Sequence, residues 1–291
     1  MRQREKKKEN FLRKASASGT FYPRDKESLL KQAKKLFGKS VPSSREIIGG
    51  VVPHAGYDYS GKLAAETIRE IYKTEPQTII ILGINHEGSP GNYIMTSGEW
   101  ETPLGKVQVD KKLATRLRES NKNLKSNPRK FSNEHSIEVE LPLLQYLAQK
   151  QKQTVKIVPI SVNTRDASEI DAIGASIAQA INNKNIKVLA SSDMSHEHPR
   201  TKTDFKQQRD SDAKIINAFT RDDWRGVLEE GKDSTICGLQ NIALLANIGE
   251  RLGNSGKKLD YATSRDEIKQ ARSGDYNVGS KRRIPPIKIH F

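Results

Sequence analysis

The chain is poor in several features that would define whole classes of protein. Its 291 residues include one cysteine, Cys237, so an intramolecular disulfide is excluded and a disulfide-stapled fold with it. No apolar run reaches the length of a membrane span, and the first ten residues, MRQREKKKEN, lack the apolar segment of a secretory signal. We therefore expect a soluble cytoplasmic protein with no membrane partner. Its length is enough to bury a substantial core without covalent staples.

Acidic residues are fewer than basic ones. Fifty Lys and Arg against 35 Asp and Glu give a formal net charge of +15, part of it gathered in the segments REKKK at 4–8 and KRR at 281–283. Basic patches can bind nucleic acid or anionic membranes. However, no RNP, zinc-finger or helix-turn-helix signature accompanies this charge. We interpret it as solvated surface charge and expect no specific nucleic-acid partner.

Apolar, β-branched segments alternate with amphipathic ones along the chain. The pattern predicts one three-layer α/β/α domain with a central mixed, mainly parallel sheet, covering residues 15–291, preceded by a flexible basic arm at 1–14. Buried strands are predicted at 47–52, 77–85, 156–162, 186–192 and 259–265, and shorter antiparallel strands between 92 and 109. Helices are predicted at 26–37, 60–73 with Ser60 as its cap, 111–120, 136–149 with Ser136 as its cap, 166–181, two within 203–230, and 237–253; residues 121–134 are predicted as a loop.

Three of the six histidines follow predicted strands. His54 ends the segment VVPH, His86 ends IIILGINH, and His196 ends VLASSDMSH. In open α/β sheets the ligand crevice lies beyond the carboxyl ends of parallel strands, so these imidazoles can converge on one cleft. Asp193, three residues before His196, is placed to orient an imidazole. One histidine at a strand end is commonly an ordinary loop residue, but three in one chain favour a functional site.

Two further residues belong with this set. His135 stands just before a predicted helix, and Cys237 opens the apolar segment CGLQNIALL, where a helix N-terminus would stabilise a thiolate. Imidazoles together with a thiolate suit a transition metal such as Fe(II), Cu or Zn. The alternative for Cys237 is a small core side chain that opens an apolar helix.

These segments in their order resemble the Memo family, whose prokaryotic members are also called AmmeMemoRadiSam system protein B. The matching stretches run from about residue 15 to 266: ASASGTFYP, HAGYDYSG, LGINH, EHSIEVELPLL, SSDMSH and TICGLQNIALL. The resemblance implies a fold related to class III extradiol dioxygenases, which are non-haem iron enzymes. It places His54, His86 and Cys237 at the metal-ligand positions, with His196, Asp193 and His135 lining the same cleft.

A cysteine stands where those dioxygenases carry a carboxylate ligand, which argues against ordinary catechol cleavage. Thiolate ligation favours redox chemistry with Fe(II) or Cu, and Zn also fits the ligands. In that hypothesis His196 acts as general acid or base and Asp193 holds its tautomer. The family label further implies a functional link to a radical-SAM protein, while the small-molecule or peptide substrate and the oligomeric state stay open.

Two other functions are compatible with the same residues. The Memo family is also linked to phosphopeptide binding, so the cleft could be a non-catalytic site for a peptide, phosphopeptide or other anion. Alternatively, Cys237 could be a nucleophile with His196 or His54 as its base.

Overall fold

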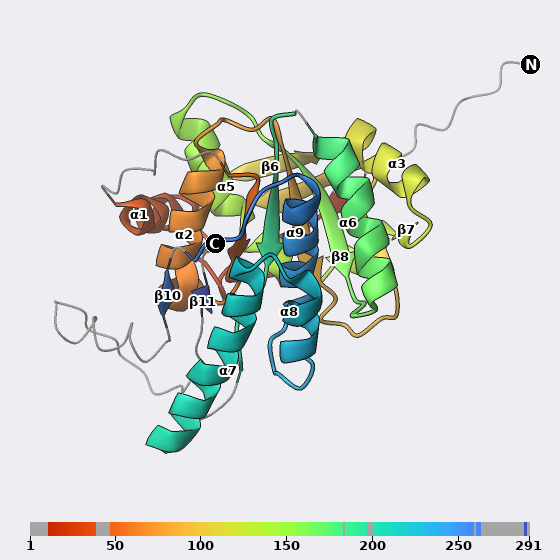
Figure 1. Ribbon diagram of the computed structural model, residues 1–291. Coiled ribbons are helices and arrows are strands. Elements are labelled where there is room, and N and C mark those ends of the chain that lie inside the picture. Colours follow the sequence, from red (N-terminus) through yellow and green to blue (C-terminus); the bar gives the residue numbers. More distant parts are fainter. Residues whose placement is uncertain are drawn as a thin grey trace, which may run out of the picture.

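The computed structural model describes residues 11–38, 47–182, 184–196, 201–258, 260–262 and 288–289. A central β-sheet lies between two layers of helices, as the alternating pattern predicts (Figure 1). No helix among these residues is long and apolar enough to cross a membrane. The basic segments 4–8 and 281–283 lie outside the described residues.

The sheet is mixed and mainly parallel. Its main path runs β1 (Leu12–Arg13), β5 (Glu99–Thr102), β6 (Gly105–Val109), β8 (Lys156–Val162), β3 (Thr78–Ile84), β9 (Ile186–Ser191) and β2 (Gly49–Val52). Along this path only β5 and β6 pair antiparallel, across a tight hairpin. Off the path, β4 (Asn92–Ile94) is antiparallel to β8 and parallel to β7 (Leu124–Ser126). The predicted antiparallel strands between 92 and 109 are therefore confirmed for the hairpin.

Helices cover both faces of the sheet (Figure 1). One layer contains α1 (Lys26–Phe37), α2 (Tyr57–Tyr72) and α5 (Leu141–Lys150), which pack on one another. The short α4 (His135–Glu138) contacts β3. The other layer contains α3 (Lys111–Ser120), α6 (Ala167–Ile181), α8 (Trp224–Glu230) and α9 (Leu239–Arg251), with α7 (Lys202–Thr220) packed on α8. A 3-10 turn, η1 (Pro128–Phe131), precedes α4.

The three central strands explain why the layers are needed. All seven residues of β3, TIIILGI, are buried, and β8 and β9 are buried over all but their first residue. Such strands have no face left for water, so helices must cover both sides. Strand β9 pairs in parallel with β3 on one side and with β2 on the other. The carboxyl ends of β2, β3 and β9 therefore lie side by side at one edge of the sheet.

Several predicted boundaries hold without change. The helices at 26–37 and 111–120 and the strand at 156–162 are found with the predicted limits. The strands at 77–85 and 186–192 and the helices at 166–181 and 237–253 differ by one or two residues at their ends. In these segments the strands are continuous apolar runs and the helices repeat apolar residues at helical spacing, and their boundaries lie where those patterns stop.

Other local predictions are wrong. Helix α2 begins at Tyr57 with Gly56 as its cap, and the Ser60 hydroxyl instead donates to the Ala55 carbonyl at 2.7 Å. The predicted helix at 136–149 is two helices that meet at Glu140, and the predicted loop at 121–134 contains β7 and η1. The predicted final core strand at 259–265 is in its described part β10 (Tyr261–Ala262), which pairs only with β11 (Lys288–Ile289) in a separate sheet.

The end of the predicted basic arm is also corrected. Leu12 and Arg13 form β1 and pair in parallel with β5, so the ordered fold begins before residue 15. The Arg13 side chain is buried, lies over the Trp100 ring and donates to the carbonyl oxygens of Phe131 and Glu134 at 2.9 and 2.6 Å. A buried guanidinium with this many acceptors cannot be released without leaving them unpaired. Residues 1–10 of the arm lie outside the described part of the chain.

Candidate metal centre

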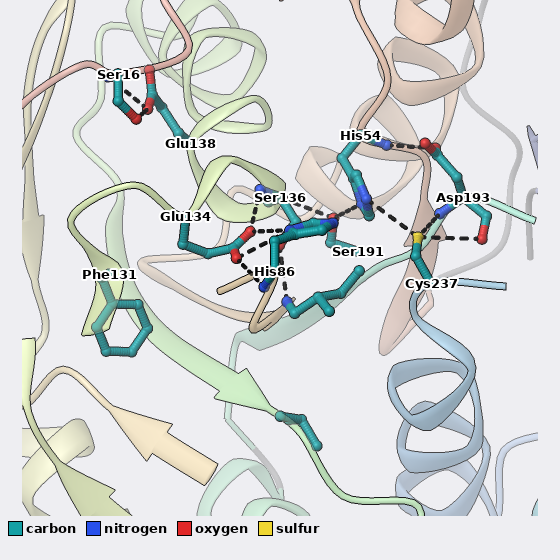
Figure 2. Close-up of polar contacts among 12 residues, drawn as sticks. Ser16, His54, His86, Phe131, Glu134, Ser136, Glu138, Ser191, Asp193 and Cys237 are labelled. Carbon is teal, nitrogen blue, oxygen red and sulfur yellow. Dashed lines mark hydrogen bonds and ion pairs between the residues drawn. The ribbon is translucent and has the colours of Figure 1, made fainter. Parts of the chain in front are cut away.

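The candidate site lies at the shared carboxyl edge of β2, β3 and β9 (Figure 2). His54 follows β2, His86 follows β3, and Asp193 follows β9. Two other elements reach the same place: the first turn of α4 brings His135, and the loop before α9 brings Cys237. The convergence expected from parallel strands therefore occurs, and it draws on five separate stretches of sequence.

His54 is held in one tautomer by its neighbours. Its Nδ1 lies 2.8 Å from the Ser191 hydroxyl, and that hydroxyl donates its single proton to the Ser136 carbonyl, also at 2.8 Å. Ser191 must therefore accept from Nδ1–H, which leaves Nε2 with a free lone pair. Burial lowers the pKa of His54, which is only 2% exposed, so the ring is neutral near pH 7. A neutral imidazole with a free Nε2 is the form that binds metals.

His86 is oriented in a similar way by a carboxylate. Its Nδ1 lies 3.0 Å from Glu134 Oε1, and its backbone N–H donates to Glu134 Oε2 at 3.0 Å (Figure 2). Burial alone would raise the pKa of Glu134, but hydrogen bonds from His86 and Ser136 outweigh it and lower the pKa to about 2. Because an ionised carboxylate only accepts, Nδ1 of His86 is the donating nitrogen, and Nε2 is the nitrogen left for another partner.

His135 lies against both of these rings. Its ring centroid is 4.2 Å from that of His86, on which it stacks, and 5.6 Å from that of His54, and the Phe21 ring lies tilted against it at 4.6 Å. Burial, followed by the neighbouring imidazoles, lowers the pKa of His135 to about 4. Three imidazoles packed this closely form a candidate ligand group for a metal ion.

Two overlapping sets of ligand atoms result. Nitrogens of His54, His86 and His135 all lie within 4.8 Å of one another, and so do ligand atoms of His54, Asp193 and Cys237. His54 belongs to both sets, whereas His86 and Cys237 fall in different ones. His86 and Cys237 of the expected ligand set thus each share a group with His54 but not with one another, and His135 is the third member of the group that contains His86.

Cys237 lies directly opposite the free nitrogen of His54. Its Sγ is 3.4 Å from His54 Nε2 and accepts a hydrogen bond from the Asp193 backbone N–H at 3.3 Å. The expectation that the helix start stabilises a thiolate is not met, because burial, followed by the charge of Asp193, raises the pKa of the thiol well above its usual range. Metal binding through this sulfur would therefore have to displace its proton.

Asp193 and His196 form the outer side of the site. Asp193 Oδ1 accepts from the His54 backbone N–H at 2.9 Å, and its Oδ2 lies 3.6 Å from His196 Nε2. Burial opposes ionisation of Asp193, but His54 and His196 lower its pKa overall, and the Asp193 carboxylate in turn raises the pKa of His196. The His196 side chain keeps 34% of its surface exposed and donates its backbone N–H to Thr235. This geometry suits a proton-exchanging group at the rim.

Several supporting residues escape prediction from sequence. Glu134, and not Ser136, caps α4 by accepting from the Ser136 backbone N–H at 2.7 Å, while the Ser136 hydroxyl accepts from Ile84 N. The sequence signal was present, since a carboxylate directly before a histidine and a serine is a common orienting and capping arrangement. Ser191, however, looks like any other buried strand residue in the sequence.

A buried network supports α4 from below. Glu138 is fully buried and accepts from Arg13, the Tyr22 hydroxyl, and the backbone N–H groups of Ser16 and Ala17. The N-terminal segment is thereby tied to the helix that carries His135. A buried carboxylate with an arginine partner and these three further donors is compensated, and removing one partner is costly.

Comparisons with known proteins agree on one family. The family model described as "Memo-like protein" matches residues 13–278. A "MEMO1 family protein" of Pyrobaculum arsenaticum is 37% identical over 91% of this chain and 93% of its own. Proteins of the same description from Saccharolobus solfataricus and Caldivirga maquilingensis are 36% and 34% identical, covering 86% and 90% of this chain and 92% and 93% of theirs.

Proposed function

This chain belongs to the Memo family, and on that premise we propose that it is a metal-binding protein that carries out redox chemistry on a small molecule or peptide. In this proposal His54, His86 and Cys237 hold a transition metal. The observation that carries the proposal is the lone pair of His54 Nε2, fixed by the Ser191 hydrogen bond and facing Cys237 Sγ at 3.4 Å. A merely structural histidine needs no such tautomer control.

The donor atoms fit such an ion. Two imidazoles whose Nδ1 atoms are hydrogen-bonded, which leaves Nε2 as the ligand nitrogen, form together with a sulfur a borderline-to-soft ligand set of the kind that Fe, Cu and Zn occupy. A bound Fe or Cu would supply one-electron chemistry, whereas Zn would act as a Lewis acid only. His135 is the alternative third ligand, and a three-imidazole set would suit the same metals.

The remaining residues have roles that do not depend on which metal binds. Glu134 and Ser191 accept from Nδ1 of His86 and His54 and so orient the rings with Nε2 as the ligand nitrogen, as outer partners do in metal sites. His196, at the rim and in contact with Asp193, can exchange a proton with a substrate. The buried floor formed by β3 and α4 limits access by water to the exposed side of His86 and His196.

The charges around the imidazoles favour a cation over an anion. Within the described chain, the charged groups that contact His54, His86 and His196 are the carboxylates of Asp193 and Glu134. Negative groups in this position would repel a phosphopeptide. Phosphopeptide binding therefore has weaker support here than metal binding.

The direct test is the metal content of protein purified without chelator and reconstituted anaerobically with Fe(II), Cu(I) or Zn(II). We expect close to one equivalent in the wild type and little in a His54→Ala, Cys237→Ala double variant. His290→Ala, which removes an imidazole from the end of the chain, should retain the wild-type content. Equal metal in all three proteins would refute the proposal. If the metal content follows the prediction, oxygen uptake by the Fe and Cu forms separates a redox role from a structural one.

A further inference from the structure

A second buried network, away from the ligands, ends at His196. Asp212 lies in α7 and is fully buried, and its Oδ1 accepts the Ser195 hydroxyl at 2.6 Å. Its other oxygen, Oδ2, accepts the Tyr261 hydroxyl at 2.9 Å. One carboxylate thus joins three parts of the chain: the segment that follows β9, helix α7, and the segment that contains β10.

The same segment after β9 is held at further points. Gln208, one turn before Asp212 on α7, donates to the Ser195 carbonyl at 3.0 Å and is itself buried. Ser195 therefore has its hydroxyl and its carbonyl bound by α7. His196, the next residue, is held from the opposite side, where its backbone N–H donates to Thr235 at 2.7 Å.

These contacts differ from ordinary core packing in two respects. Two of them are hydrogen bonds to the buried carboxyl group of Asp212, which leave a costly unpaired group when broken. They also act on the residue next to a half-exposed imidazole, whose ring contacts Asp193 at 3.6 Å. Helix α7 thus fixes the residue before His196, while Thr235 contacts His196 itself through the backbone N–H and, at 3.3 Å, through Nδ1 of the ring.

We propose that Asp212 is a positioning residue for His196, with Tyr261 as its support from the C-terminal part of the chain. Asp212 fixes Ser195, and the fixed Ser195 backbone aims the His196 ring at Asp193 over the candidate metal centre. The assignment of His196 as a proton-exchanging group rests on the proposed function, but the positioning itself does not.

The test is the rate at which diethyl pyrocarbonate modifies His196, measured by peptide mass spectrometry with fragment ions that separate it from His198. His86, on another strand end, serves as the internal reference. In Asp212→Asn the His196 rate relative to His86 should rise about two- to tenfold, the range that corresponds to the loss of one hydrogen bond. Tyr261→Phe, which leaves the Ser195 contact intact, should raise it less.

The matched control is Asp210→Asn, an exposed position on the same helix, which should leave the ratio unchanged. If Asp212→Asn does not fold, Ser195→Ala removes the same hydrogen bond with a smaller disturbance, and the same increase is expected. An unchanged ratio in Ser195→Ala and Tyr261→Phe would overturn the inference. Metal content reports on the proposed function separately, since the modification rates can be compared in metal-free protein.

Discussion

Replacing Glu134 by glutamine should weaken metal binding and acid stability together. Both carboxylate oxygens accept backbone hydrogen bonds, Oε1 from Ser136 N at 2.7 Å and Oε2 from His86 N at 3.0 Å, while Oε1 also receives His86 Nδ1 at 3.0 Å. A glutamine amide has one oxygen and one NH₂ group in place of the two carboxylate oxygens. Its NH₂ group must therefore face at least one of these N–H groups, which then has no acceptor. The His86 ring then loses its fixed orientation or α4 loses its cap.

The structure sets the size of both effects. Loss of an outer partner of a ligand histidine costs about 10- to 100-fold in metal affinity, or about 1.4–2.7 kcal/mol. Loss of a helix cap costs about 0.5–2 kcal/mol of stability. The pKa of Glu134 is lowered to about 2 from an ordinary 4.5, so its ionised form stabilises the fold above about pH 4.5, and this contribution disappears as the pH falls toward 2. The shift corresponds to about 3 kcal/mol, which Glu134→Gln would lack.

The assay has two parts. Competition with a chromophoric chelator gives the metal affinity of each protein, and urea unfolding at neutral and acid pH gives the free energy of unfolding. We expect the wild type to lose more stability than Glu134→Gln as the pH falls below about 4.5. Glu101→Gln is the matched control at an exposed carboxylate whose ion pair with Lys14 is on the surface. Wild-type metal affinity together with an unchanged acid profile in Glu134→Gln would refute the reasoning.

Three further predictions follow from single contacts. Ser191→Ala removes the acceptor that fixes His54 Nδ1–H, so metal affinity measured by chelator competition should fall about 10- to 100-fold with little change in fold. Gly83→Ala would place a Cβ 2.4 Å from Ile137 Cγ1, so the free energy of urea unfolding should drop by about 1–3 kcal/mol, and an unchanged value would contradict the packing described. The pKa of His135 is lowered to about 4 from 6.5, so as the pH falls His135 is protonated in the unfolded chain before it is protonated in the folded one. The free energy of unfolding should therefore decline as the pH falls from about 6.5 to 4. His135→Asn should flatten that decline in urea unfolding measured across this pH range.

The regular part of the fold could be predicted because its signals are local. The β3 sequence TIIILGI has no polar side chain except its first, and the α3 segment repeats apolar residues at helical spacing between an Asp cap and a polar end. By contrast, the two residues of β1 and the two of β10 are too short for any periodic pattern. Arg13 looks like part of a charged arm in sequence, and only its tertiary contacts with Glu138 and Phe131 place it in the core.

Some features of the candidate site could likewise be predicted from the sequence and others could not. Histidines at strand ends are visible in sequence, because strand direction in a parallel sheet decides which ends meet. The contacts that set protonation are not visible, since Ser191, Ser136 and Glu134 meet the imidazoles only after β3, β9 and α4 are packed together. For the same reason the sequence indicated a thiolate at Cys237, whereas burial beside Asp193 favours the thiol.

The central claim is that Cys237, and not His135, completes the metal-binding set with His54 and His86. Reconstitution with Co(II) tests it most directly, because sulfur ligation adds a thiolate-to-metal charge-transfer band in the near ultraviolet that imidazole ligation lacks. We predict that the wild type and His135→Ala show this band and that Cys237→Ser binds Co(II) without it. A wild-type spectrum lacking the band, with Co(II) binding lost in His135→Ala but kept in Cys237→Ser, would contradict the account and assign the metal to the three imidazoles.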